Sequence, residues 1–191
     1  MTKKYELVLD DTISFWGWKL FRIRALISFG SVEAGDLGGY IEKEENLSHD
    51  GNAWVSGDAK VSGNAEVRGN AKVSGNAEVR GNAKVSGNAE VRGNAKVSGN
   101  AEVSGDAKVS GNAEVWGNAK VSELGDIIVF KNHWSSGRHF TYTKSNKMWK
   151  VGCFYGTGQE LIEKAYRDSE KSGNYYKACV DFVENLEKLG D

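Results

Sequence analysis

The stretch between Ile127 and Gln159 combines basic and aromatic side chains and contains no acidic residue. Basic groups neutralise phosphate and flat rings stack on bases, so this composition is typical of a nucleotide or nucleic-acid surface. A protein partner and a purely structural role are the alternatives, because a small domain needs several rings for its core. The residues we expect to contact a ligand are Lys131, His133, Trp134, Arg138, Tyr142, Lys147, Trp149, Lys150, Tyr155 and Thr157.

Two backbone features of this stretch also suit an anion. The Ser135-Ser136-Gly137-Arg138 segment reads as a turn, and Thr157 with Glu160 forms a capping-box pattern that begins a helix. The free N–H groups of a helix N-terminus favour negative charge. The capping box alone would also explain Thr157.

His49 is the single candidate for catalysis. A histidine can act as a general base when the proton that it removes lies within hydrogen-bond reach. It precedes the repeat region in phase with the valine positions, and no carboxylate pattern near it indicates a catalytic partner. We therefore favour a capping role for His49, and we expect neither a cofactor nor a metal.

These candidates flank a repeat that runs from Gly51 to Ser122, twelve hexapeptides of the type GNAKVS without an insertion. Within each unit Ala and Val alternate with polar residues and share one face, as in a short strand. The Gly-Asn pair suits a corner, because both residues tolerate left-handed backbone conformations. Such short strands bury little alone, so their stability must come from stacked coils.

The charge that follows each alanine alternates in sign along the repeat. Two or four hexapeptides per coil would stack like charges, which is destabilising. Three per coil give columns of alternating sign, such as Lys60, Glu78, Lys96 and Glu114. The sequence therefore predicts that three hexapeptides make one coil, and that the repeat contains four such coils.

The V-S-G-N-A-K pattern resembles the left-handed β-helix hexapeptide repeat, in which a small residue follows an aliphatic one by four positions. The resemblance implies a left-handed, three-sided coil and a homo-oligomer, a trimer or dimer. Hexapeptide acyltransferases share this repeat and use a histidine at the coil edge, so an acyltransferase with His49 as its base is an alternative function. Those enzymes usually extrude a loop from the helix, and residues 51–122 contain none.

Nearly the whole chain also resembles GNA-repeat proteins of bacteriophages and prophages. The matching segments are KLFRIRAL, AGDLGGYI, NLSHDGNAWV and TYTKSNKMWKVGCFYGTG. This resemblance implies a phage accessory protein that inhibits a host or defence factor, by sequestering a nucleotide signal or by blocking a protein. A structural component of the virion is a further alternative.

Residues 1–50 are predicted to form an N-terminal β cap, because the open end of a solenoid must be covered. Tyr5–Leu9 and Lys19–Leu26 read as strands, and Asp10-Asp11-Thr12 as a turn. Ile41 and Leu47 are in phase with the alanine positions, which predicts a first irregular coil from about residue 38. Trp54 and Trp116 are expected to point outward and to contact the flanking caps.

Residues 123–191 are predicted to form a small α+β domain of about three strands and two helices. The strands are expected at Asp126–Phe130, Arg138–Thr143 and Met148–Phe154, and the helices from Thr157 to about Glu170 and at Tyr175–Leu189. Alternation directs Arg138, Phe140 and Tyr142 to the face opposite His139, Thr141 and Thr143. Only half of the candidate contacts can therefore share one surface.

The predicted fold class is mainly β: a three-sided, left-handed parallel β-helix with an N-terminal β cap and a C-terminal α+β domain. The predicted domains are residues 1–50, 51–122 and 123–191. The chain has 191 residues and a formal net charge of −1, and its two cysteines suggest a reducing compartment. With no apolar run long enough for a membrane helix, we expect a cytoplasmic, non-enzymatic binding protein in the host cell without a membrane partner.

Overall fold

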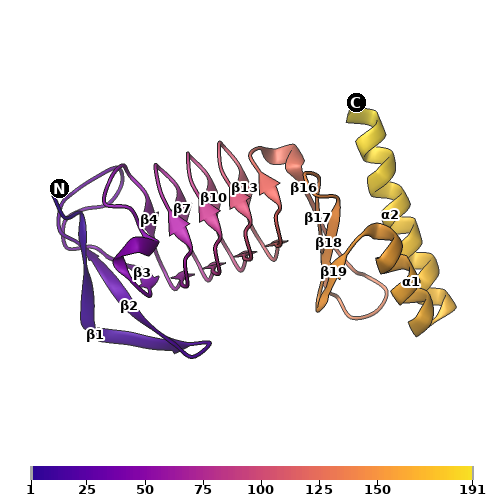
Figure 1. Cartoon of the computed structure of the whole chain (residues 1–191), viewed down its shortest axis with the longest axis horizontal. Coiled ribbons are helices and arrows are strands. Elements are labelled where there is room, and N and C mark those ends of the chain that lie inside the picture. The colour runs from indigo at the N-terminus through magenta and orange to yellow at the C-terminus, as the bar shows by residue number, and fades with distance from the viewer. Residues whose placement is uncertain (1, 191) are drawn as a thin grey trace. The chain divides into compact units, whose positions relative to one another are not determined.

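The computed structural model describes residues 2–190, which fold into two compact units, the first ending at Asp126 and the second beginning at Ile127 (Figure 1). The division falls after Asp126, slightly beyond the predicted end of the repeat at Ser122. A short 3₁₀ helix, Leu124–Asp126, closes the first unit.

The repeat region folds as a parallel β-solenoid of two-residue strands in three stacks (Figure 1). Each strand pairs with the strand three hexapeptides further on, as in Lys60↔Glu78, so the predicted coil length and charge columns are confirmed. The stacks run β5-β8-β11-β14, β4-β7-β10-β13 and β6-β9-β12-β15. The strands are β4 (Trp54–Val55), β5 (Lys60–Val61), β6 (Glu66–Val67), β7 (Lys72–Val73), β8 (Glu78–Val79), β9 (Lys84–Val85), β10 (Glu90–Val91), β11 (Lys96–Val97), β12 (Glu102–Val103), β13 (Lys108–Val109), β14 (Glu114–Val115) and β15 (Lys120–Val121).

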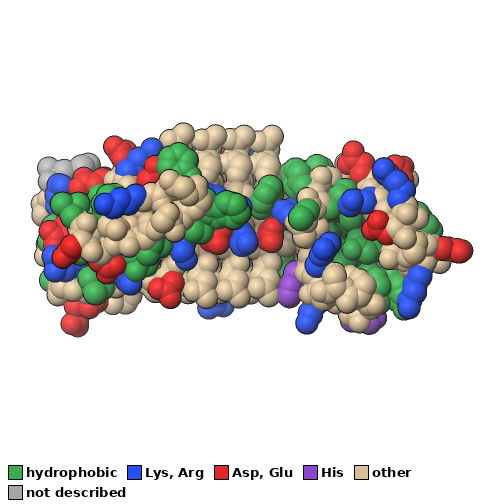
Figure 2. Space-filling model, turned by 90° about the horizontal axis from the view of Figure 1, so that it is seen from below, with side chains coloured by type: hydrophobic (Ala, Val, Ile, Leu, Met, Phe, Trp, Pro, Cys, Tyr) green, Lys and Arg blue, Asp and Glu red, His purple; other side chains and the backbone are tan. Residues whose placement is uncertain are grey.

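The solenoid core consists of the repeated alanine and valine side chains, which are fully buried from Ala53 to Val121. The corners require glycine: Gly69 has a φ of 69°, and a Cβ there would lie 3.2 Å from the backbone nitrogen of Gly87. Beside the glycines, the asparagine amides form ladders, as in Asn52 to Asn70 at 3.3 Å. These mostly uncharged corners appear as straight rows in Figure 2.

The N-terminal end of the solenoid is capped by side chains that donate hydrogen bonds. Inside the solenoid the glycine, alanine and valine carbonyls accept from the preceding coil, as when Trp54 N donates to Ala71 O. In the first regular coil, Lys4 Nζ donates to Ala53 O at 2.8 Å, and Asn46 Nδ2 donates to Ala65 O at 2.8 Å. These side-chain donors satisfy carbonyls of the first regular coil, because no complete coil precedes it to supply backbone N–H groups.

At the opposite end the unmatched groups are N–H donors, and a carboxylate meets two of them. Asp126 Oδ2 accepts from Ser122 N at 2.6 Å and from Glu123 N at 3.1 Å. Each cap therefore supplies the partner that the unpaired backbone groups at its end require. Side-chain donors meet carbonyls at the N-terminal end, and a carboxylate acceptor meets N–H groups at the C-terminal end.

An irregular coil precedes the repeats, as predicted, but in a different phase. In β3 (Leu37–Ile41), Ile41 pairs with Val61, and Leu47 bridges to Val67. These side chains therefore continue the valine columns, whereas the sequence assigned them to the alanine columns. The 3₁₀ helix Glu44–Asn46 lies between Ile41 and Leu47, which keep the spacing of the repeat, and the phase shifts in the longer connection from Leu47 to β4.

The N-terminal cap is an antiparallel hairpin of β1 (Tyr5–Phe15) and β2 (Trp18–Ala25). The predicted turn at Asp10-Asp11-Thr12 was wrong, because pairing passes from Val8↔Arg22 to Thr12↔Phe21 through a bulge. The chain reverses instead at Trp16 and Gly17, where φ is 52° and 84°.

Trp54 contacts the N-terminal cap directly, whereas Trp116 is connected to the hairpin through Arg80. Trp54 is buried, with Phe29 edge-on to its ring at a centroid distance of 5.4 Å. The guanidinium of Arg80 lies 5.1 Å from the ring of Trp16 and 5.9 Å from that of Trp116. One arginine thus links the hairpin tip to the last coil, within the first unit.

The second unit is a four-stranded antiparallel sheet with two helices. Its elements are β16 (Ile127–Lys131), β17 (His139–Thr143), β18 (Met148–Val151), β19 (Phe154–Gly156), α1 (Gly158–Asp168) and α2 (Glu170–Gly190). Phe154–Gly156 forms a strand that the sequence did not predict, because the chain reverses at Gly152, where φ is 56°. The helices are separated by Ser169, and the predicted break at Ser172-Gly173-Asn174 lies inside α2.

Candidate functional site

The aromatic-basic loop, residues 131–138, leads from β16 into β17 and contains four of the predicted contact residues. Asn132 is buried and organises it: its backbone N–H donates to Arg138 O at 2.8 Å. Its side-chain Oδ1 accepts from the N–H groups of Trp134 and Ser135, at 2.9 and 3.0 Å. This turn of the Asx type holds the loop in one conformation without regular secondary structure.

Three rings form a cluster between the aromatic-basic loop and α2. Trp134 stacks on Tyr175 with a centroid distance of 4.6 Å and an interplanar angle of 9°. His133 lies edge-on to both rings, at 5.3 and 6.0 Å. Trp134 also contacts Phe140 in the core, so the cluster is anchored while the His133 side chain stays exposed. Tyr175 was not predicted as part of the site, because only tertiary structure brings α2 to this loop.

The cations of the loop are exposed and have no carboxylate partner. Neither Lys131 nor Arg138 forms an ion pair with any residue between 2 and 190. The side chain of Arg138 lies against Gly152, where a Cβ would be 3.0 Å from its Cδ. Burial raises the pKa of the Tyr176 phenol, and the positive charge of Arg138 partly opposes this increase. The loop therefore carries unneutralised positive charge beside an anchored ring cluster.

Tyr142 and Trp149, which were expected to contact a ligand, are core residues. They lie opposite each other on β17 and β18 and are 4% and 2% exposed. Tyr142 donates a 2.8 Å hydrogen bond to Glu187 Oε1, and burial together with that carboxylate raises the pKa of Tyr142. Alternation correctly separated the two faces of β17. It could not show that the Phe140–Tyr142 face packs against the helices.

Lys150 also departs from the expectation of an exposed cation. It is 6% exposed, and its ammonium group donates to the carbonyl oxygen of Gly152. Tyr155 is half-buried, and its hydroxyl accepts from Asn146 Nδ2 at 3.2 Å; burial raises its pKa. Lys147 remains exposed, beside a cleft that also contains Glu184.

Thr157 is the N-cap of α1, with the capping box that the sequence predicted. Its backbone N–H donates to Glu160 Oε2 at 2.8 Å, and its Oγ1 accepts from Glu160 N at 3.3 Å. Thr157 Oγ1 also donates to Glu160 Oε2 at 3.0 Å, and the backbone and side-chain bonds to this carboxylate lower the pKa of Glu160. The carboxylate of Glu160 itself thus occupies the position at this helix N-terminus that an anionic ligand would take.

His49 is held inside the N-terminal cap. Its ring stacks on Tyr5 at a centroid distance of 4.3 Å, and its Nδ1 accepts from the backbone N–H of Lys4 at 3.2 Å. Its Nε2 lies 3.7 Å from Glu44 Oε2, a carboxylate neighbour that the sequence pattern did not reveal. With the Nδ1 lone pair engaged, Nε2 carries the proton of the neutral ring. The Nδ1 lone pair of His49 is thus engaged by a backbone donor of the cap.

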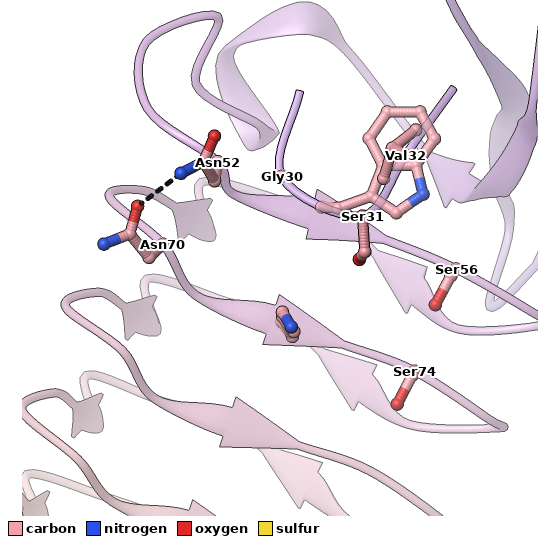
Figure 3. Close-up of a pocket in the computed structure, with 9 residues that line it drawn as sticks. Gly30, Ser31, Val32, Asn52, Ser56, Asn70 and Ser74 are labelled. Atoms are coloured by element: carbon pink, nitrogen blue, oxygen red, sulfur yellow. Dashed lines mark hydrogen bonds between the residues drawn. The ribbon is translucent and has the colours of Figure 1, made fainter. Parts of the chain in front are cut away.

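A second cleft lies in the first unit, beneath the turn at Gly30-Ser31-Val32 (Figure 3). Its volume is about 470 Å³, and Asn52, Ser56, Asn70 and Ser74 line it from two adjacent coils. This cleft was not predicted from the sequence, because asparagines and serines recur at the same positions in most of the repeats. Only the position of the turn distinguishes them.

No protein-family model and no curated protein matches the chain in sequence. No helix between residues 2 and 190 is long and apolar enough to cross a membrane. The function must therefore be inferred from the aromatic-basic loop and its surroundings.

Proposed function

We propose that this protein is a non-enzymatic binding protein that captures a phosphate-bearing ligand, a nucleotide or a nucleic-acid strand, through the aromatic-basic loop. One observation carries the proposal: Lys131 and Arg138 are exposed without ion pairs beside the anchored rings of Trp134 and Tyr175. An exposed cation without a protein partner can neutralise phosphate at little cost in broken contacts.

The ring cluster provides the second kind of ligand contact, a surface on which a base can stack. His133 is exposed and braced edge-on by Trp134 and Tyr175, so a base can stack on it against a rigid support. The indole Nε1 of Trp134 is buried, and no residue between 2 and 190 accepts its hydrogen bond. A buried donor without an acceptor costs about 1–3 kcal/mol, and a ligand oxygen that reached it would recover part of this.

Isothermal titration calorimetry of the full chain tests the proposal, with mononucleotides, cyclic nucleotides and a single-stranded 12-nucleotide DNA as probes. The Lys131→Glu/Arg138→Glu variant should lose at least ten-fold in affinity. The matched control, Lys164→Glu/Lys188→Glu, makes the same charge change on the helices and should bind normally. Binding should weaken with salt, by a slope of about 0.7–0.9 per phosphate contacted.

Equal affinity of the loop variant and its control would reject the loop as the site. If no probe binds and an acidic protein partner binds through Lys131 and Arg138, the surface recognises protein instead. Acetyl transfer from acyl-coenzyme A that is lost in His49→Ala would establish the acyltransferase alternative.

The wider role follows from the resemblance to bacteriophage and prophage proteins. We propose that the protein acts in the host cytoplasm as a phage accessory factor and inhibits a host or defence protein by sequestering its nucleotide signal. Expression in bacteria that carry such a defence should restore plaque formation by a sensitive phage. The Lys131→Glu/Arg138→Glu variant should fail to do so, and recovery of the protein in purified virions would favour a structural component.

We further propose that the solenoid is a left-handed, three-sided coil that serves as a rigid scaffold. Strand pairing at an interval of three hexapeptides, in three stacks, supports the three-sided shape. The handedness follows from the resemblance to the left-handed hexapeptide repeat, and a crystal structure would test it directly.

A further inference from the structure

The cleft beneath the turn at residues 30–32 is lined by neutral polar groups and by one cation, Lys72. The hydroxyls of Ser31, Ser56 and Ser74 form no hydrogen bond with any residue between 2 and 190. Ser56 and Ser74 point the same way from adjacent coils, and the side chain of Ser31 points from the turn toward the solenoid (Figure 3). Each hydroxyl is therefore available to donate and to accept a hydrogen bond from a molecule in the cleft.

Lys72 has one carboxylate neighbour in its column, where other lysines inside the repeat have two. Lys84, for example, lies between two glutamates. Lys72 lies between Trp54 and Glu90, because the chain has tryptophan at the position where the alternation of charge would place an acid. The cleft opens beside this position, since Trp54 and Lys72 both line it.

The ammonium group of Lys72 is not neutralised by the protein. Lys72 is exposed and forms no ion pair with any residue in the described range 2–190. Its carboxylate neighbour, Glu90, instead lies 3.9 Å from Nη1 of Arg92. Neighbouring strands are about 4.8 Å apart, so an acidic group held beside Trp54 would lie next to Lys72 and continue the alternation of charge.

The turn above the cleft is held in one conformation. Phe29 and Val32 exchange two backbone hydrogen bonds of 2.9 Å. The ring of Phe29 lies edge-on to Trp54, and Lys4 Nζ lies 4.8 Å from the centroid of the Phe29 ring. The cleft is thus preformed, and a ligand would not have to order the turn on binding.

The groups around the cleft select the chemistry of its ligand. Its volume of about 470 Å³ suits a small molecule. None of the described residues that line it has a carboxylate, so a ligand amine would have no counter-charge. Trp54 is only 8% exposed, so it contributes an apolar wall but no free ring face on which a base could stack. One cation among several hydroxyls therefore favours a hydroxylated acid over an amine or a nucleotide.

We propose that this cleft binds a small hydroxylated acid of the sugar-acid class. The acidic group pairs with the ammonium group of Lys72, in the place beside Trp54 where the charge column has no acid. The ligand hydroxyls exchange hydrogen bonds with Ser31, Ser56 and Ser74. This site lies in the first unit and is separate from the aromatic-basic loop, which belongs to the second.

Nuclear magnetic resonance titration of the full chain tests the site. Glucuronate, gluconate and glucose-6-phosphate are the acidic probes, and glucose is the neutral one. At least one acid should bind and shift the resonances of the Trp54 indole and of the Asn52 and Asn70 side-chain amides. Glucose should bind at least about ten-fold more weakly, because it cannot pair with Lys72. A preference for the carboxylates or for the phosphate would identify the acidic group.

Lys72→Met keeps the apolar stem of the side chain and removes its charge. We expect it to bind the acid about ten-fold more weakly. The matched control is Lys108→Met, which makes the same change two coils further along the same column and should bind as the wild type does. Ser56→Ala/Ser74→Ala should also weaken binding, by about five-fold, because it removes two hydroxyl contacts. Thermal unfolding should show all three variants folded, since each leaves the alanine and valine core intact.

The proposal is wrong if no acid binds, if glucose binds as tightly as the acids, or if the shifted resonances lie outside the cleft. It is also wrong if Lys72→Met and Lys108→Met bind equally well. The Lys131→Glu/Arg138→Glu variant should bind the acid with unchanged affinity, and Lys72→Met should bind nucleotides normally. Failure of this site is therefore distinguishable from failure of the aromatic-basic loop.

Discussion

The ammonium group of Lys4 donates a 2.8 Å hydrogen bond to the carbonyl oxygen of Ala53 at the open end of the solenoid. Further along the chain the same kind of carbonyl accepts from a backbone N–H of the preceding coil, as Ala71 O does from Trp54 N. A second bond from Lys4 reaches Gly51 O at 3.3 Å, and the whole side chain is buried. The Lys4 side chain thus takes the place of backbone N–H donors that a preceding coil would provide.

Lys4→Met should destabilise the first coil, because it keeps the apolar stem of the side chain and removes both donors. We expect a loss of about 1–3 kcal/mol, since the carbonyl of Ala53 would stay buried without a partner. Hydrogen exchange should become faster around β4. Lys84→Met, which removes an exposed lysine from the middle of the solenoid, should change little. Equal stability of the two variants would contradict the capping role of Lys4.

The burial of Lys4 predicts that its contribution to the free energy of unfolding increases with pH, whereas the contribution of an ion-paired lysine decreases. Desolvation lowers the pKa of Lys4 from 10.5 to about 8, and Asp50 opposes the shift. Between pH 8 and 10.5 the unfolded chain therefore binds more protons at this position than the folded chain. The contribution of Lys4 to the free energy of unfolding should increase with pH across that window.

Nuclear magnetic resonance of the lysine side chains can test this value. The Cε resonance of Lys4 should titrate near pH 8, below those of the exposed lysines. The neutral amine keeps two N–H donors, so the bonds to Gly51 and Ala53 can persist above that pH. A midpoint above pH 10 would show that the ammonium group is solvated.

Gly173→Ala should destabilise the second unit although alanine is the better helix former. A Cβ at Gly173 would lie 2.1 Å from Cδ1 of Tyr166, so α1 and α2 could not keep their present packing. We expect a loss of about 1–3 kcal/mol in thermal or urea unfolding. Ser172→Ala, one residue earlier in α2, is the control and should be neutral or slightly stabilising. A stabilised Gly173→Ala variant would contradict the contact with Tyr166.

Asn132→Ala tests whether the conformation of the aromatic-basic loop matters apart from its charge. The variant loses the side-chain bonds to Trp134 N, Ser135 N and Ser135 Oγ but retains every cation. We expect ligand affinity to fall by about ten-fold, because ordering the loop would then cost entropy on binding. Calorimetry with the ligand found for the wild type measures this, and Ser136→Ala in the same loop should bind normally. Undiminished affinity of Asn132→Ala would show that charge alone recruits the ligand.

Much of the first unit could be predicted because its determinants are local and repeated. The alternation of Ala and Val selects the buried face, and the alternating Lys and Glu columns select a coil of three hexapeptides. Each of these two patterns recurs many times along the chain, so one irregular hexapeptide does not change the predicted fold. The capping box at Thr157 was predictable for the same reason, since its partners are three residues apart.

What the sequence left open depends on contacts between distant residues. Alternation separates Tyr142 from Thr141, but only packing against the helices decides that Tyr142 and Trp149 are buried. Tyr175 joins the aromatic-basic loop because α2 passes beside it, although β17, β18, β19 and α1 separate the two in sequence. Local pattern therefore determined the strands, corners and coil length. Tertiary packing decided which rings and cations reach a ligand, because burial is set by what an element packs against.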